Sequence, residues 1–165
     1  MNNNVVHVTF GPSAYSLFMK ACAIDDHDPD EAIRLYRRAI HLDPGCSEAM
    51  TNLGRVYFRM SLYGAAEAWW DRSIKVNPRA ADAYYNLAYL RLIRKDYRSA
   101  ITHFEMVIGI EPSFADAYYN LAEALSELGR HEEARACLRT HIKLRGAWSV
   151  EAQELLGMRL IQGGR

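Results

Sequence analysis

The sequence predicts an all-α fold, an α-solenoid of about four helix pairs with one further helix at its C-terminal end. The first observation behind this prediction is an internal period of 34 residues, carried by Ala32, Ala66, Ala100 and Ala134. The second is that the apolar residues of each period fall at helical spacing in two blocks with a turn between them. Because one such pair leaves an apolar face in water, neighbouring pairs are expected to stack and bury it.

The same period joins several other kinds of residue. It links isoleucines, prolines, alanines and asparagine–leucine pairs: Ile40, Ile74, Ile108 and Ile142; Pro44, Pro78 and Pro112; Ala49, Ala83 and Ala117; Asn52-Leu53, Asn86-Leu87 and Asn120-Leu121. In the third copy, Lys95-Asp96 divides the two apolar blocks, and the second block ends at Pro112, since proline stops a helix. Each copy is therefore predicted to be a helix–turn–helix unit.

These positions resemble the signature of the tetratricopeptide repeat (TPR), which runs from a large residue through Leu-Gly and Tyr to Ala-x3-Phe and Pro. The second copy matches it closely, with Met50, Leu53-Gly54, Tyr57, Ala66, Trp70 and Pro78. The third copy departs from it with Arg91 where Tyr is usual, and the fourth with Gly146 where Pro is usual. The resemblance covers residues 12–148 and implies a right-handed solenoid of TPR helix pairs.

The predicted elements follow in order along the chain. Residues 1–11 are expected to be a mobile or extended segment, and they lack the basic head of a secretion signal. The four repeats are placed at 12–46, 47–80, 81–114 and 115–148, with about one inserted residue before Asp28 in the first. Residues 149–165 are predicted to form an amphipathic helix and tail that cap the exposed end of the stack. Met1 and this end helix favour a complete unit over a fragment.

Two local features explain how the helices begin and pack. Asp28-Pro29 is a good helix start, with Asp28 as the N-cap and Glu31 placed for a capping box. Small residues let the paired helices approach closely, and bulky residues fill the space beside them: Gly54, Ala88 and Ala122 against Trp70, Phe104 and Leu138. Next to Trp70, the neighbouring Trp69 is expected to pack against the next repeat or to contribute to a dimer surface.

Composition excludes several classes of function. The 165 residues carry 20 basic and 20 acidic side chains, so the basic excess that a nucleic-acid or anionic-membrane binder uses is missing. No apolar run reaches the roughly 20 residues that span a bilayer, which argues against membrane insertion. Cys22, Cys46 and Cys137 are odd in number and far apart, so they predict free thiols in a reducing compartment, the cytoplasm.

The sequence also argues against an enzyme, a cofactor and a metal site. It contains no phosphate loop, dinucleotide fingerprint or nucleophile elbow, and its six histidines have no metal-ligand spacing. The acidic string Asp25-Asp26-His27-Asp28 is not a calcium loop, because Glu31 and Arg37 stand where such a loop needs Gly and Glu. We therefore predict a protein that is not an enzyme.

The resemblance implies that the first helix of each repeat lines a concave groove. Carried over position by position, the peptide-binding residues are Asn52, Arg55 and Arg59; Tyr85, Asn86 and Tyr89; Tyr119, Asn120, Glu123 and Glu127. The three asparagines resemble the ladder with which family members hold a peptide backbone, or they bond only to their own helices and to water; both interpretations stay open. The tyrosines are candidate anchors, whereas Tyr84 and Tyr118 are expected in the core.

Charge on the expected groove runs from the cations Arg55 and Arg59 to the carboxylates Glu123 and Glu127. We therefore expect a protein or peptide partner whose basic residues face the two glutamates. The favoured hypothesis is a non-catalytic scaffold or adaptor that holds an extended peptide. The alternatives are a small TPR chaperone for a secreted substrate, similar to those of type III secretion, and a self-assembling structural module. The sequence identifies neither the partner nor the pathway.

Overall fold

The computed structural model describes residues 11–145, and all structural statements below refer to that part of the chain. Within it there are eight α-helices and no strand. The helices are α1 (Ala14–Ile24), α2 (Pro29–Leu42), α3 (Ser47–Arg59), α4 (Tyr63–Val76), α5 (Ala81–Ile93), α6 (Tyr97–Ile110), α7 (Ala115–Glu127) and α8 (His131–Arg145). The helix predicted at 149–165, the segment 1–10 and Gly146 lie outside the described residues.

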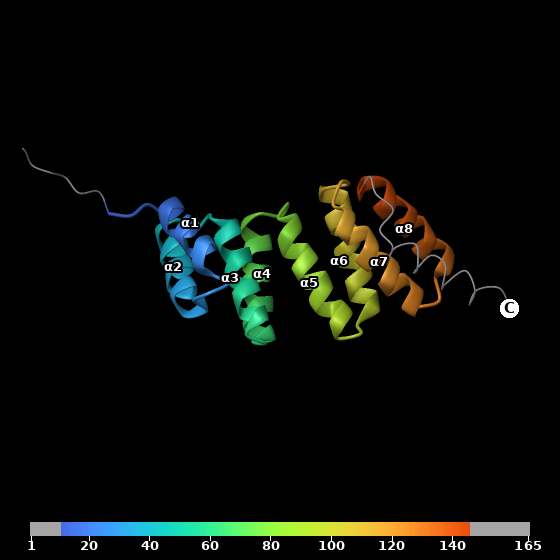
Figure 1. Cartoon of the computed structure of the whole chain (residues 1–165), viewed down its shortest axis with the longest axis horizontal. Coiled ribbons are helices and arrows are strands. Elements are labelled where there is room, and N and C mark those ends of the chain that lie inside the picture. The colour runs from blue at the N-terminus through green and yellow to red at the C-terminus, as the bar shows by residue number, and fades with distance from the viewer. Residues whose placement is uncertain (1–10, 146–165) are drawn as a thin grey trace, which may run out of the picture.

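The helices form a row of hairpins along the long axis of the molecule, from α1 and α2 at one end to α7 and α8 at the other (Figure 1). Each helix packs most extensively on its partner in the same hairpin, and the second helix of a hairpin also contacts the first helix of the next. This arrangement confirms the predicted all-α solenoid. The residue boundaries of the repeats stay a prediction.

The start of α2 shows how far the sequence determined local structure. Asp28 is its N-cap, and the Oδ1 atom accepts a hydrogen bond from the backbone N–H of Glu31 at 3.0 Å, with Pro29 as the first helical residue. The reciprocal half of the capping box does not form. The backbone N–H of Asp28 donates to the carbonyl of Ile24, and the Glu31 carboxylate pairs with Arg34 at 2.6 Å instead.

One turn recurs between the two helices of the second, third and fourth hairpins. Its central residues, Ser61, Lys95 and Gly129, all have positive φ values of 61°, 60° and 75°. The next residue donates its N–H to a carbonyl five residues earlier, as in Asp96 to Arg91 and the equivalent bonds of the other turns. This is the Schellman geometry, which satisfies the last carbonyls of a helix, and it recurs in three hairpins.

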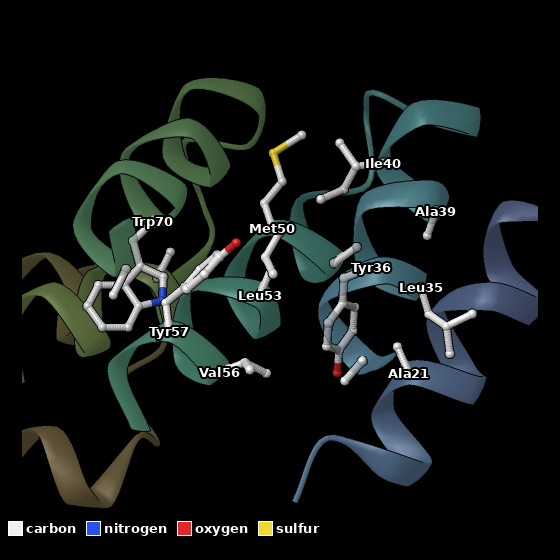
Figure 2. Packing of buried hydrophobic residues seen from close by; sticks show 14 of the residues in the cluster. Ala21, Leu35, Tyr36, Ala39, Ile40, Met50, Leu53, Val56, Tyr57 and Trp70 are labelled. Carbon is white, nitrogen blue, oxygen red and sulfur yellow. The ribbon is translucent and has the colours of Figure 1, made fainter. Parts of the chain in front are cut away.

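Close packing inside the second hairpin depends on a glycine that faces Trp70, one of the buried side chains shown in Figure 2. A Cβ atom on Gly54 would lie only 2.6 Å from Cδ1 of Trp70, whose side chain is 1% exposed. The Trp70 indole N–H donates to the carbonyl of Thr51 at 3.1 Å, so the ring is held in place. In the next hairpin the equivalent positions hold Ala88 and Phe104, both buried in the same cluster, and the smaller phenyl ring suits the extra methyl group.

The buried apolar residues form two clusters that meet in α5. Leu87 and Leu90 complete the first cluster, whereas Ala88 and Leu92 begin the second. At this junction, Glu67 of α4 forms ion pairs with Arg91 of α5 and with Arg94, the C-cap of that helix. Arg91 stands where the repeat signature has Tyr, and the ion pairs explain that departure.

Candidate functional site

The first helices of the hairpins share one face of the stack. Besides contacts between consecutive helices, α3 contacts α5 and α5 contacts α7 directly. In a curved stack, the helices that approach one another across a repeat lie on the inside of the curve. We call the solvent-facing side of α1, α3, α5 and α7 the inner face; its exposed side chains include Arg55, Arg59, Tyr89, Glu123 and Glu127.

At the α1 end of the inner face, both predicted cations are neutralised by one buried acid. Asp25 is 3% exposed, and its carboxylate accepts hydrogen bonds from Arg55 at 3.0 Å, Arg59 at 3.2 Å and the Tyr36 hydroxyl at 2.9 Å. Arg59 also pairs with Asp26 at 3.3 Å. The prediction of a positively charged end is therefore wrong, because the two arginines there pair with two aspartates.

The ionisation of Asp25 reflects this environment. Burial alone would raise its pKa, but the hydrogen bonds from Tyr36 and Arg55 and the positive charges of Arg55 and Arg59 outweigh it, and the pKa lies below its usual value. Burial, together with hydrogen bonds to Cys22 and Asp25, raises the pKa of Tyr36. The cluster thus joins α1, α2 and α3 as a structural network.

The three asparagines of the predicted ladder differ in their surroundings. The Asn52 amide donates to the Cys22 sulfur at 3.4 Å, and Asn120, only 8% exposed, donates to the Tyr85 hydroxyl at 2.8 Å. Asn86 is half-buried and makes no side-chain hydrogen bond within residues 11–145. Its amide is the member of the three with its donors and acceptor still unpaired.

Tyrosines of the site also divide into packed and exposed ones. Tyr85 stacks on Phe114 at 4.9 Å between ring centroids, and burial, then the charge of Asp116, raises its pKa. Tyr119 is half-buried and packs 5.4 Å from the His141 ring. Tyr89 is 39% exposed and braced by Phe58 at 6.0 Å. Of the three candidate anchors, Tyr89 offers the largest free surface.

The two tyrosines expected in the core are not buried. Tyr84 and Tyr118 are both half-exposed, and the Tyr118 hydroxyl donates to the carbonyl of Pro112 at 3.1 Å. Tyr84 still packs against the second cluster of buried residues, so it borders the core without being enclosed by it.

An apolar strip and two carboxylates lie on neighbouring helices of the inner face. Tyr89 and Ile93 of α5 are exposed, Ile93 by 44%. On α7, Glu123 and Glu127 are exposed, and the Tyr97 hydroxyl donates to Glu127 at 3.3 Å. Neither glutamate has a basic partner within the described residues. This half of the inner face is apolar and negative.

A hollow of about 520 Å³ opens where α3 and α5 begin. Three carboxylates line it, from Glu48, Asp82 and Glu111, with a single guanidinium from Arg79 and an aromatic wall from Phe18. None of these five residues is among the peptide-binding residues predicted from the sequence. Glu48 and Asp82 lie in the first turns of α3 and α5, and the other three lie elsewhere. Those come from a turn, from the end of α6 and from α1, and only the stacking of the hairpins brings them together.

Other chemistry is sparse in the described part of the chain. No group of three or more His, Cys, Asp or Glu side chains there is placed to hold a metal ion. Burial raises the pKa of the Cys46 and Cys137 thiols, which keeps both protonated and poorly nucleophilic near neutral pH. No helix between residues 11 and 145 has the length and apolar character needed to cross a bilayer.

The chain resembles a known protein family and several solved structures. The family model of the tetratricopeptide repeat matches residues 23–90 and 91–157. A search of curated protein sequences gave no match. Among solved structures, a crystal structure of MamA is 26% identical, with a TM-score of 0.72 over 82% of this chain and 80% of that one.

Two further structures share the fold. MamA 41-end from Desulfovibrio magneticus RS-1 is 21% identical, with a TM-score of 0.79 over 93% of this chain and 86% of that one. The first TPR of Spaghetti (RPAP3), bound to the HSP90 peptide SRMEEVD, is 24% identical, with a TM-score of 0.65 over 71% of this chain and 94% of that one.

Proposed function

The chain belongs to the tetratricopeptide repeat family, and from that premise we propose that it is a non-catalytic scaffold or adaptor holding an extended peptide of a partner protein. Proteins of this family are generally interaction modules, and the matched Spaghetti structure contains a bound peptide. Both support binding of a peptide by this chain. A cytoplasmic location stays a prediction from cysteine usage.

The observation that carries the proposal is an exposed apolar strip next to two carboxylates that have no basic partner within residues 11–145. Tyr89 and Ile93 offer apolar surface to a partner side chain, and Tyr89 is already held by Phe58, so little rotamer entropy is lost on binding. Glu123 and Glu127 on the adjacent helix attract a lysine or arginine of the same peptide. The unpaired amide of Asn86 can bond to the peptide backbone between them.

The charge of the inner face also indicates the charge of the partner peptide. With Arg55 and Arg59 neutralised, and with Glu48, Asp82, Glu123 and Glu127 exposed on α3, α5 and α7, the inner face is predominantly negative. The HSP90 peptide held by the Spaghetti domain is acidic. An acidic peptide of that kind is expected to bind the inner face of this chain poorly, and a basic one well.

The proposal can be tested with two labelled peptides of equal length. One alternates leucine and lysine, and the other replaces each lysine by glutamate; fluorescence anisotropy gives the dissociation constants. E123Q/E127Q should weaken binding of the basic peptide about 2- to 30-fold relative to the wild-type chain, since exposed pairs contribute roughly 0.2–1 kcal/mol each, and it should not weaken binding of the acidic peptide.

The matched control is D71N/E105Q, which removes the same two charges from exposed positions on α4 and α6. This variant should bind the basic peptide almost as the wild type does. Equal weakening by both variants would mean that only net charge matters, and the proposed site would be refuted.

A further inference from the structure

A second hollow, of about 300 Å³, lies on the opposite set of helices, between α2 and α4. Its walls are Arg37, Ile40, His41, Pro44, Trp69 and Arg72. None of these residues belongs to the first helices that form the inner face. The sequence left Trp69 without a role beyond packing or a dimer contact, and the structure places it, half-buried, in this wall.

The two arginines in this hollow are positioned by neutral partners. Arg37 donates through Nη2 to the Tyr57 hydroxyl at 2.9 Å, and the Arg72 guanidinium lies over the Trp69 ring, 5.1 Å from its centroid. Within residues 11–145 neither arginine forms an ion pair with a carboxylate, unlike the arginines that Asp25 and Glu67 neutralise. Both positive charges therefore remain available at fixed positions.

The lining contrasts with that of the other hollows described. The inner hollow contains three carboxylates, and a hollow between α6 and the α7–α8 turn contains Glu105 beside Arg98 and Arg130. The hollow at Trp69 has no carboxylate in its wall. The nearest acid along α4 is Asp71, but consecutive helical residues point to different sides, and the Asp43 carboxylate accepts the backbone N–H of Gly45.

We propose that this hollow is a second binding site, which takes a peptide segment with a carboxylate side chain next to an apolar one. The carboxylate pairs with the guanidinium groups of Arg37 and Arg72, which suit carboxylate geometry and already have fixed orientations. The apolar side chain packs against Trp69, Ile40 and Pro44. The volume lies at the lower end of the range for ligand pockets and accommodates two side chains rather than a whole domain.

This site goes beyond peptide binding on the inner face, because it prefers the opposite charge and uses different helices. One chain can then hold a basic segment on α5 and α7 and an acidic segment between α2 and α4. The two can belong to different proteins, and the chain would bridge them.

The test uses a labelled, blocked peptide with two Asp-Leu steps flanked by Gly-Ser, and a matched peptide with Asn for each Asp. Wild-type protein should bind the Asp peptide and not the Asn peptide. R37Q/R72Q should weaken binding about 2- to 30-fold. R38Q/R139Q removes the same charge from exposed α2 and α8 positions outside the hollow and should leave the affinity unchanged.

Three results would overturn the proposal. The first is equal affinity for the Asp and Asn peptides, and the second is equal weakening of Asp-peptide binding by R37Q/R72Q and R38Q/R139Q. The third is a loss of affinity for the Asp peptide in E123Q/E127Q as large as that in R37Q/R72Q. W69F serves as a second variant that keeps all charges. It should weaken binding of the Asp peptide, while circular dichroism confirms an unchanged fold. Since E123Q/E127Q tests the inner face alone, failure of one site is distinguishable from failure of the other.

Discussion

Replacing Gly54 by alanine is expected to destabilise the protein, although alanine is the better helix former. The Cβ atom of the new residue would lie 2.6 Å from Cδ1 and 3.0 Å from Cε2 of Trp70. Ordinary contacts between carbon atoms are about 3.5–4.0 Å, so the indole must move by about 1 Å. Trp70 is 1% exposed and hydrogen-bonded to Thr51, which leaves it no free space.

The magnitude follows from three opposing effects. Alanine in place of glycine gains about 1 kcal/mol of helix propensity. Overpacking costs about 1–3 kcal/mol, and disturbing the hydrogen bond from Trp70 to Thr51 costs about 1 kcal/mol more. The net expected loss is about 1–3 kcal/mol in the free energy of unfolding, read from the midpoint of urea denaturation followed by circular dichroism.

The control for this substitution comes from the chain itself. G54A/W70F reproduces in the second hairpin the pairing of Ala88 with Phe104 in the third. The double variant should lose less stability than the sum of the two single variants, by about 1 kcal/mol or more. A G54A protein as stable as the wild type, or more stable, would refute the argument that Trp70 requires glycine there.

Three other predictions concern stability. S61G and K95G should each raise the free energy of unfolding by about 1 kcal/mol, because both residues have positive φ, and G129A should lower it; urea denaturation measures all three. The lowered pKa of Asp25 adds stability above its unfolded pKa of about 3.9, and this is lost as pH falls through the folded value, so wild type should lose more stability than D25N between pH 5 and pH 2. E67A should cost about 1–2 kcal/mol, because it leaves the half-buried Arg91 unpaired; thermal melting compared with E105A checks this.

The repeat architecture could be predicted because each copy contains the same local pattern of residues. The period, the small residues such as Gly54 and the cap at Asp28 depend on neighbours within one helix pair, and each appears in the structure as expected. The side-chain partners across repeats could not be predicted in this way. Asp25 reaches Arg55 and Arg59 across some 30 residues of sequence, and no local pattern indicates that meeting.

The candidate site shows the same division. Position in the repeat placed Tyr85 and Tyr89 on one helix, but exposure depends on the side chains of neighbouring hairpins. Phe114 covers Tyr85, whereas Phe58 supports Tyr89 from one side and leaves it exposed. Both hollows are likewise made by residues from separate hairpins and turns, so their lining required the three-dimensional arrangement.

The central claim, that the inner face binds a basic peptide, is tested most directly by reversing its charge. The measurement compares the affinities of the leucine–lysine and leucine–glutamate peptides for E123K/E127K. The chain also carries R37Q/R72Q, so that the hollow at Trp69 does not contribute. We expect this variant to bind the basic peptide more weakly and the acidic peptide more tightly than R37Q/R72Q alone does. Unchanged affinities for both peptides would contradict the proposed site.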